Sequence, residues 1–332
     1  MAPLIVGLSG TRLTAREADY LSSVRPLGLI LFARNIETGP QVTQLVADAV
    51  AASGAGLVFV DQEGGRVQRI RPPLAPRYPA GAVIGALYLR DAAAGLRAAW
   101  LAGRLISADL LPLGLNAPCL PVADVPVPGA HDIIGDRAYG TAPDVVAALA
   151  GAAAEGVLAA GALPVLKHIP GHGRAGVDSH VALPRVDADR AALQADFAPF
   201  RALSHLPMAM SAHVLYTALD PAAPATLSPS VIRLIREDIG FDGLLMTDDI
   251  SMGALGGSIA DNAAAALSAG CDCVLHCNGR MDEMERIASA LPPISAEAAR
   301  RVVRVDEARR PLPADDVAAL RREFEALVGA AA

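Results

Sequence analysis

The chain has 332 residues, of which 53% are hydrophobic and 19% charged, and its formal net charge is −7. This composition supports a large packed interior and argues against intrinsic disorder, and an acidic chain without a basic stripe is a poor candidate for binding nucleic acid. The first residues, MAPLIVGLSGTR, lack the pattern of a secretory signal, and no apolar run reaches the roughly 18 residues of a membrane span. We therefore expect a cytoplasmic protein without a membrane partner.

Short apolar runs that favour β-strands recur along the chain, separated by alanine-rich stretches of helical period. Helices are expected at 41–53, 142–160 and 228–239, the last with Ser228 as N-cap and Pro229 as its first residue. Eight strands that alternate with helices indicate an α/β fold of the (β/α)8 barrel type. The eight runs are LIVGLSG (4–10), GLILFAR (28–34), GLVFVDQ (56–62), LGLNAPCL (113–120), ALPVLKH (162–168), PMAMSAH (207–213), GLLMTDD (243–249) and CDCVLHCN (271–278).

The domain organisation follows from the regular spacing of these runs. An open doubly wound sheet is the alternative fold, but it does not normally need eight evenly repeated units. No linker rich in proline, glycine or serine interrupts the series. We therefore expect a single barrel domain over residues 1–332, with two additional amphipathic helices from about residue 295 packed on its outside, and a monomer.

Polar and ionisable residues follow the predicted strands at their carboxyl ends. Side chains from the ends of several different strands are typical of the active-site face of a barrel, whereas solvated surface residues would be scattered over helix faces. The residues are Asp61 after the third strand, Lys167 and His168 after the fifth, His213 after the sixth, Asp248 and Asp249 after the seventh, and Asn278 after the eighth.

The segment DQEGGRVQR begins at the end of the third strand. Asp61 and Glu63 alternate to the same side if the strand continues, and the glycines at 64–65 permit a sharp turn. Arg66 and Arg69 can neutralise the two carboxylates. We expect Glu63 and Arg66 to form a structural ion-pair turn and Asp61 to bind ligand, because a carboxylate accepts hydrogen bonds from adjacent hydroxyls.

Two further loops carry candidate site residues. In TDDISM, Asp248 should project into the barrel mouth, and Asp249 should point away towards a helix N-terminus, where a carboxylate is stabilised. Arg137 lies in GDRAYG after the fourth strand, where it is either an ordinary surface residue or a contact to substrate.

The segment KHIPGHGRAGVDSH, residues 167–180, holds three of the seven histidines. His168 and His172 have the i, i+4 spacing of a helical metal site, but the proline and glycine at 170–171 break a helix. Asp178 and His180 can instead form a proton-transfer dyad, because an aspartate on one imidazole nitrogen raises the basicity of the other. His172 is expected to brace the loop, and its glycines predict a loop that brings His180 to the site when sugar binds.

The four cysteines, at 119, 271, 273 and 277, fit no disulfide framework. Three of them lie in CDCVLHC, which alternates like a buried strand, and a zinc site there is a minor alternative. We expect neither a metal nor another cofactor.

The motifs DQEGGRVQR, GDRAYG, KHIPGHG, DSH and TDDISM occur in an order that resembles the family 3 glycoside hydrolases. More narrowly, they resemble the single-domain bacterial β-N-acetylglucosaminidases of peptidoglycan recycling. The resemblance spans nearly the whole chain. It departs at Ile169, where the family usually has phenylalanine, at Thr247, where serine is common, and at Arg174, which adds a charge to the loop.

The resemblance implies a role for each candidate residue. Asp248 would be the nucleophile and His180 the general acid/base, with Asp178 as its partner. Substrate hydroxyls would be bound by Asp61, Arg69, Arg137, Lys167 and His168. The implied substrates are N-acetylglucosaminyl-anhydro-N-acetylmuramyl peptides, cleaved with retention at the non-reducing end.

Three alternatives remain open at this point. A phosphorylase could use the same site, because a neutral histidine would not repel phosphate as a glutamate would. A metal-dependent barrel hydrolase could use the histidines. A non-catalytic sugar-binding protein is disfavoured, since binding alone requires no Asp–His dyad.

Overall fold

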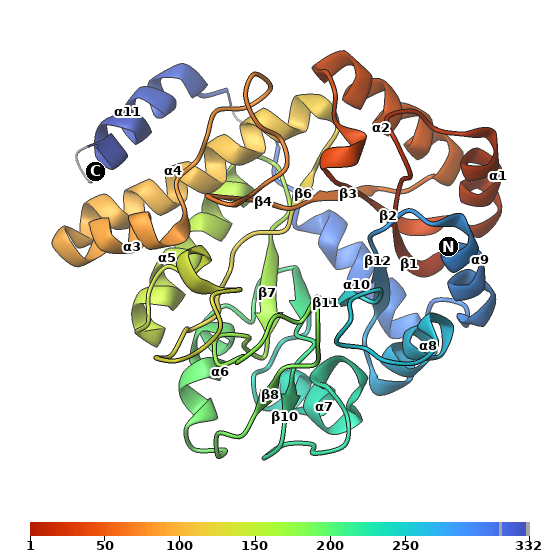
Figure 1. Cartoon of the computed structure of the whole chain (residues 1–332). Helices are drawn as coiled ribbons and strands as arrows, with labels where there is room; N and C mark the ends of the chain where they lie inside the picture. Colours follow the sequence, from red (N-terminus) through yellow and green to blue (C-terminus); the bar gives the residue numbers. More distant parts are fainter. Residues whose placement is uncertain (312–313, 330–332) are drawn as a thin grey trace.

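The computed structural model describes residues 1–311 and 314–329 as a barrel of strands surrounded by helices (Figure 1). Within these residues, eight parallel strands form one sheet in the order β6–β3–β2–β1–β12–β11–β9–β7. Each strand overlaps one predicted apolar run, so the predicted (β/α)8 fold is confirmed; the predicted domain end at residue 332 lies outside the described residues. The strands are β1 Ala2–Gly7, β2 Pro26–Leu31, β3 Leu57–Val60, β6 Ala117–Pro118, β7 Val165–Ile169, β9 Met208–Ser211, β11 Leu244–Asp249 and β12 Cys273–His276.

The barrel closes between β6 and β7. β6 is short because proline has no N–H for a strand ladder, and two prolines lie in this part of the chain. The pairing nevertheless continues past β6: Lys167 N donates to Pro121 O at 3.0 Å, and Ala123 N donates to Lys167 O at 2.7 Å. These bonds join the two ends of the sheet.

Helices alternate with the strands and cover the outside of the barrel (Figure 1). The predicted start of α7 is confirmed, since the Ser228 side chain accepts from Val231 N and Pro229 is the first helical residue. The helices are α1 Ala15–Val24, α2 Gly39–Ser53, α3 Gly81–Arg90, α4 Ala92–Leu110, α5 Pro143–Ala159, α6 Leu193–Ala202, α7 Pro229–Glu237, α8 Ile259–Ala269, α9 Met281–Ala290, α10 Ala296–Glu307 and α11 Val317–Gly329.

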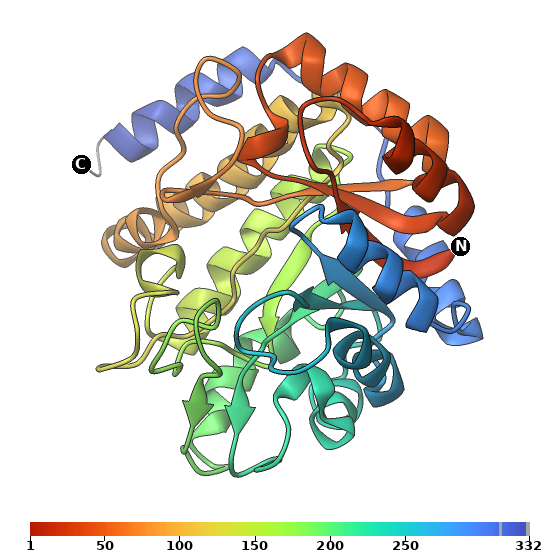
Figure 2. The same cartoon turned by 45° about the vertical axis from the view of Figure 1, so that its right-hand side comes forward.

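In the described residues the two larger hydrophobic clusters lie between the sheet and the helices and inside the barrel. The inner cluster contains Ile5, Phe59 and Met246, and it also contains Val305 of α10. Helix α10 therefore covers the amino-terminal end of the barrel, while α11 packs along α4 (Figure 2). The opposite end, where the strands finish, remains open to loops, including the short antiparallel pair β4 Gln62–Gly64 and β5 Val67–Gln68.

Candidate active site

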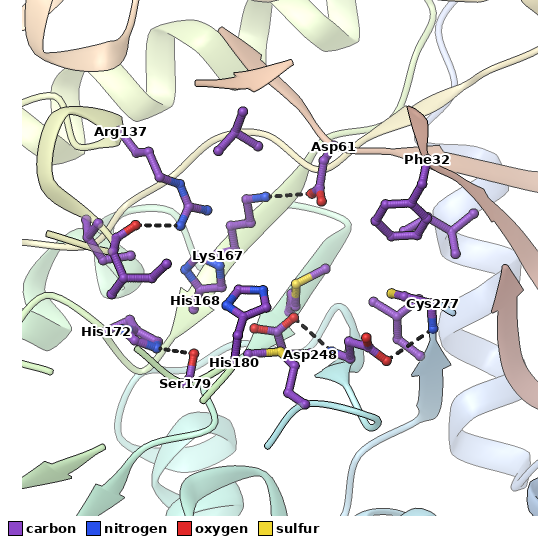
Figure 3. Close-up of a pocket in the computed structure, with 18 of the residues that line it drawn as sticks. Phe32, Asp61, Arg137, Lys167, His168, His172, Ser179, His180, Asp248 and Cys277 are labelled. Carbon is purple, nitrogen blue, oxygen red and sulfur yellow. Dashed lines mark hydrogen bonds and ion pairs between the residues drawn. The ribbon is translucent and has the colours of Figure 1, made fainter. Parts of the chain in front are cut away.

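A cavity of about 280 Å³ lies at the carboxyl ends of the strands (Figure 3). Asp178 does not line it, but the other sequence-predicted site residues all do. Those residues are Asp61, Arg69, Arg137, Lys167, His168, His180 and Asp248. Side chains that are far apart in the sequence meet here because parallel strands end at the same rim of a barrel.

A chain of buried and partly buried ion pairs forms one wall of the cavity. Lys167, whose side chain is 2% exposed, places Nζ 3.1 Å from Asp61 Oδ1 and 2.5 Å from Glu63 Oε1. Arg137 Nε and one of its terminal nitrogens each lie 2.8 Å from an oxygen of Glu63. Arg69 lies 3.1 Å from the other oxygen of Asp61. Paired buried charges of this kind hold each other in one geometry.

The partners of the two carboxylates differ in part from those predicted. Arg69 does neutralise Asp61, but Arg66 does not contact Glu63; it pairs with Asp132 at 3.0 Å and Asp136 at 3.3 Å. Glu63 is neutralised by Arg137, from the segment after β6, and by Lys167 of β7. Burial alone would raise the pKa of Glu63, yet Arg137 and Lys167 lower it overall. Glu63 is therefore an ionised structural residue, and it does not itself line the cavity.

Asp248 is placed at the end of β11, in the barrel mouth as predicted. Its Oδ1 accepts the backbone N–H of Asp249 at 2.8 Å. Burial would raise the pKa of Asp248, but the neighbouring His168 and His213 lower it overall. The carboxylate is therefore ionised near neutral pH and available as a nucleophile or as a hydrogen-bond acceptor.

Asp249 does not reach a helix N-terminus, so this prediction is wrong. Its oxygens accept from Ser251 N at 3.1 Å, Ser251 Oγ at 2.7 Å and Cys277 N at 3.1 Å, while α8 is capped by Ser258. Asp249 thus ties the turn after β11 to the end of β12. It still touches the cavity.

His213 and Asn278 also end strands, but neither lines the cavity. His213 is fully buried and lies 3.0 Å from the carbonyl oxygen of Asp249 through Nε2. Asn278 donates to Glu283 Oε2 at 2.6 Å. Both residues stabilise the strand ends that carry the site.

Asp124 is a buried carboxylate of the site that the sequence prediction missed. Its Oδ2 lies 2.7 Å from His168 Nδ1, and its Oδ1 accepts the backbone N–H groups of His168 and His172 at 3.2 and 2.7 Å. Burial raises the pKa of Asp124, but His168 and the hydrogen bonds lower it to about 2. Asp124 therefore holds the Nδ1 proton of His168 and leaves Nε2 for the cavity.

The predicted Asp178–His180 pair is present in the loop after β7. His180 Nδ1 lies 2.8 Å from Asp178 Oδ1, which also accepts the backbone N–H of His180 at 2.9 Å. His180 already lines the same cavity as Asp248, rather than standing apart from it (Figure 3). Motion of this loop on sugar binding stays a prediction.

The floor of the cavity is apolar and sulfur-rich, with Phe32, Met210, Leu275 and Cys277 among its lining. All four cysteines are buried free thiols, and burial raises the pKa of Cys277 well above its usual value. Among the described residues, no three His, Cys, Asp or Glu side chains converge in a way that could hold a metal ion. Nor does any helix of that part of the chain have the length and apolarity to cross a bilayer.

The fold and this combination of residues can be compared with known proteins. Residues 6–307 match the glycosyl hydrolase family 3 N-terminal domain. A beta-hexosaminidase from Alkalilimnicola ehrlichii is 42% identical over 286 residues, covering 84% of this chain and 81% of that protein. A beta-hexosaminidase from Idiomarina loihiensis is 36% identical, covering 92% of each chain.

The fold is also similar to that of a solved structure. NagZ from Neisseria gonorrhoeae, in complex with N-trifluoroacetyl-D-glucosamine, superposes with a TM-score of 0.88 at 32% identity, covering 100% of this chain and 98% of that chain. The family match and these relatives, together with a barrel that carries a carboxylate and a histidine at its mouth, define the protein as a glycoside hydrolase. The chain belongs to glycosyl hydrolase family 3, as the sequence motifs predicted. Its enzymatic activity is that of a beta-hexosaminidase.

Proposed function

We propose that the chain is an exo-acting, retaining β-N-acetylglucosaminidase in which Asp248 is the nucleophile and the Asp178–His180 dyad is the general acid/base. The observation that carries this proposal is that Asp248, at the end of β11, and His180, in the loop after β7, line one cavity. The cavity ends on a closed apolar floor, which suits the end of a sugar chain better than its middle. Retention needs a nucleophile and a proton donor at one anomeric carbon, and these two residues supply both.

The proposed reaction has two steps. In the first, an oxygen of Asp248 bonds to the anomeric carbon while the imidazolium of His180 gives its Nε2 proton to the departing glycosidic oxygen. In the second, neutral His180 takes a proton from water, the water oxygen bonds to the anomeric carbon, and the Asp248 carboxylate is released. Asp178 accepts a hydrogen bond from the Nδ1–H of His180 throughout, so that Nε2 exchanges the reacting proton.

The proposed substrates are N-acetylglucosaminyl-anhydro-N-acetylmuramyl peptides from peptidoglycan. The N. gonorrhoeae structure holds an N-acylated glucosamine, which supports a sugar of this type. Hydroxyl groups of the sugar would be bound by the polar wall, namely Asp61, Arg69, Arg137, Lys167 and His168. The cytoplasmic location and the monomeric state expected from the sequence stay predictions.

The test is to trap the covalent intermediate. A 2-deoxy-2-fluoro glycoside should leave one sugar on the peptide that contains Asp248, seen by mass spectrometry, and NMR should show product of retained configuration. Fragmentation must place the sugar on Asp248 rather than on Asp249, which serves as the internal control. A label elsewhere or an inverted product would refute the mechanism, and a sugar phosphate formed in added phosphate would identify a phosphorylase instead.

A further inference from the structure

The loop that carries the dyad contains a buried hydrogen bond outside the two proposed chemical steps. Ser179 is 2% exposed, although the His180 side chain beside it is 64% exposed. Ser179 Oγ lies 3.1 Å from His172 Nε2 (Figure 3). We propose that this bond is a latch that positions the Asp178–His180 dyad over Asp248, and that His172 and Ser179 are positioning residues for proton transfer. The latch rests on the proposed function of His180.

The His172 side of the latch is fixed to the barrel. The backbone N–H of His172 donates to Asp124 Oδ1 at 2.7 Å, and Asp124 is fully buried. The next residue, Gly173, lies so close to the chain at Val125 that a Cβ there would be 2.0 Å from the Val125 carbonyl oxygen. His172 therefore cannot follow a movement of the loop, and it offers Ser179 a stationary partner.

The protonation state of His172 determines which group donates the hydrogen bond of the latch. Burial lowers the pKa of His172 to about 4, so the ring is neutral at pH 7. Its Nδ1 is buried without a hydrogen-bond partner in the described structure. An orphaned buried N–H group is rarer than an under-used acceptor, so we assign the proton to Nε2, which donates to Ser179 Oγ.

A second set of contacts ties the same segment to the loop after β11. Ala254 N donates to Ser179 O at 3.0 Å, and Gly253 N donates to His180 O at 3.2 Å. A Cβ on Gly253 would lie 2.8 Å from His180 O, so this approach requires glycine. Because this loop follows Asp248 directly, the contacts set the dyad's position relative to the nucleophile.

The test compares Ser179→Ala, His172→Ala and Gly253→Ala on two substrates. A dyad that is out of place should slow N,N′-diacetylchitobiose, whose leaving group needs a proton, and spare 4-nitrophenyl β-N-acetylglucosaminide, whose leaving group does not. Loss of one hydrogen bond predicts about a three- to tenfold fall in kcat/KM for the disaccharide. The Ser179→Ala/His172→Ala double variant should be no worse than either single variant, because both remove the same bond.

Controls separate this role from general loosening of the fold. Ser107→Ala makes the same chemical change at a fully buried serine in α4, whose Oγ donates to Gly103 O at 2.8 Å, and should affect both substrates alike. His172→Gln keeps an N–H near Nε2 and should restore part of the disaccharide activity. Equal losses on both substrates, or additive losses in the double variant, would overturn the latch. If His180→Ala itself lacks leaving-group selectivity, the proposed function fails as well.

Discussion

Replacing Glu63 by glutamine tests whether this residue is a structural anion or a proton donor. Glu63, whose side chain is 4% exposed, accepts two hydrogen bonds from Arg137 and contacts Lys167. These cations hold it ionised, so it has no proton to give at neutral pH. Glutamine has the same shape, but its NH2 group would face a donor that needs an acceptor.

The size of the effect follows from the contacts that remain. Removing one partner of a buried ion pair typically costs about 3–5 kcal/mol. Lys167 keeps Asp61, and Arg137 keeps the carbonyl oxygen of Ile133 while the amide oxygen of the glutamine remains as an acceptor, so we expect the lower end of that range. Because both cations also belong to the wall proposed to bind sugar, kcat/KM should fall by about tenfold or more, equally for good and poor leaving groups.

Two measurements check this prediction. Urea unfolding gives the change in stability, and kcat/KM is compared between an aryl glycoside and N,N′-diacetylchitobiose. Glu323→Gln is the matched control, because Glu323 also pairs with an arginine through two hydrogen bonds but lies on the surface, where about 1 kcal/mol or less is expected. Unchanged stability together with a loss confined to the disaccharide would show that Glu63 donates the proton.

Three other predictions concern the wall, the dyad and the loop. Single alanine variants of the wall residues should each lower kcat/KM at least about tenfold in steady-state assays, and four normal variants would mean that the sugar binds elsewhere. His180→Ala should slow substrates with poor leaving groups more than aryl glycosides, and Asp178→Ala should show a weaker form of that selectivity; equal losses on all substrates would make His180 a binding residue. Burial raises the pKa of Asp196 to about 6 although Arg174 lies 2.5 Å away, so Arg174→Ala should raise it further. When the folded-state pKa of a carboxyl is raised, its contribution to the free energy of unfolding is lost as the pH rises through that pKa. Urea unfolding of Arg174→Ala should therefore show about 1–3 kcal/mol of destabilisation at pH 8 and less at pH 5. A larger loss at pH 5 would contradict this reasoning. The four wall residues to be replaced in this test are Asp61, Arg137, Lys167 and His168.

The barrel could be predicted from the sequence because each of its strands is a short apolar run with a helical stretch after it. Most of the candidate site could be predicted for a related reason: Asp61, Lys167 and Asp248 directly follow such runs, and parallel strands bring their ends together. The Ser228 cap of α7 depends on local residues alone, so it too was within reach.

Asp124 was missed because the fourth strand was taken to end at Leu120. The prolines there remove ladder donors, yet the chain stays paired with β7 as far as Ala123, and Asp124 is the next residue. The rule that identified Asp61 would have identified Asp124 if the strand had been extended through PVA. The sequence therefore contains the pattern that identifies Asp124, but the predicted strand ended three residues too early.

The pairing of Glu63 could not be predicted from local sequence. Arg66 is close in the chain, whereas Arg137 and Lys167 are 74 and 104 residues away. Which cation reaches Glu63 depends on how β7 and the segment that carries Arg137 lie around the barrel mouth, and spacing along the chain carries no such information. The prediction that Asp249 points to a helix N-terminus was wrong for a similar reason, since its partner Cys277 lies at the end of another strand.

The ion pairs of the site have a consequence for how such a site can change during evolution. Asp61 and Glu63 share Lys167 of β7, and each also pairs with an arginine, so a substitution at one position leaves an unpaired charge at another. Substitutions at this site should therefore accumulate as paired replacements during evolution. A library of variants designed for other sugars should likewise vary these residues in charge-matched sets. The paired groups are the carboxylates Asp61 and Glu63 and the cations Arg69, Arg137 and Lys167, so a change in any one of them calls for a matching change in its partner.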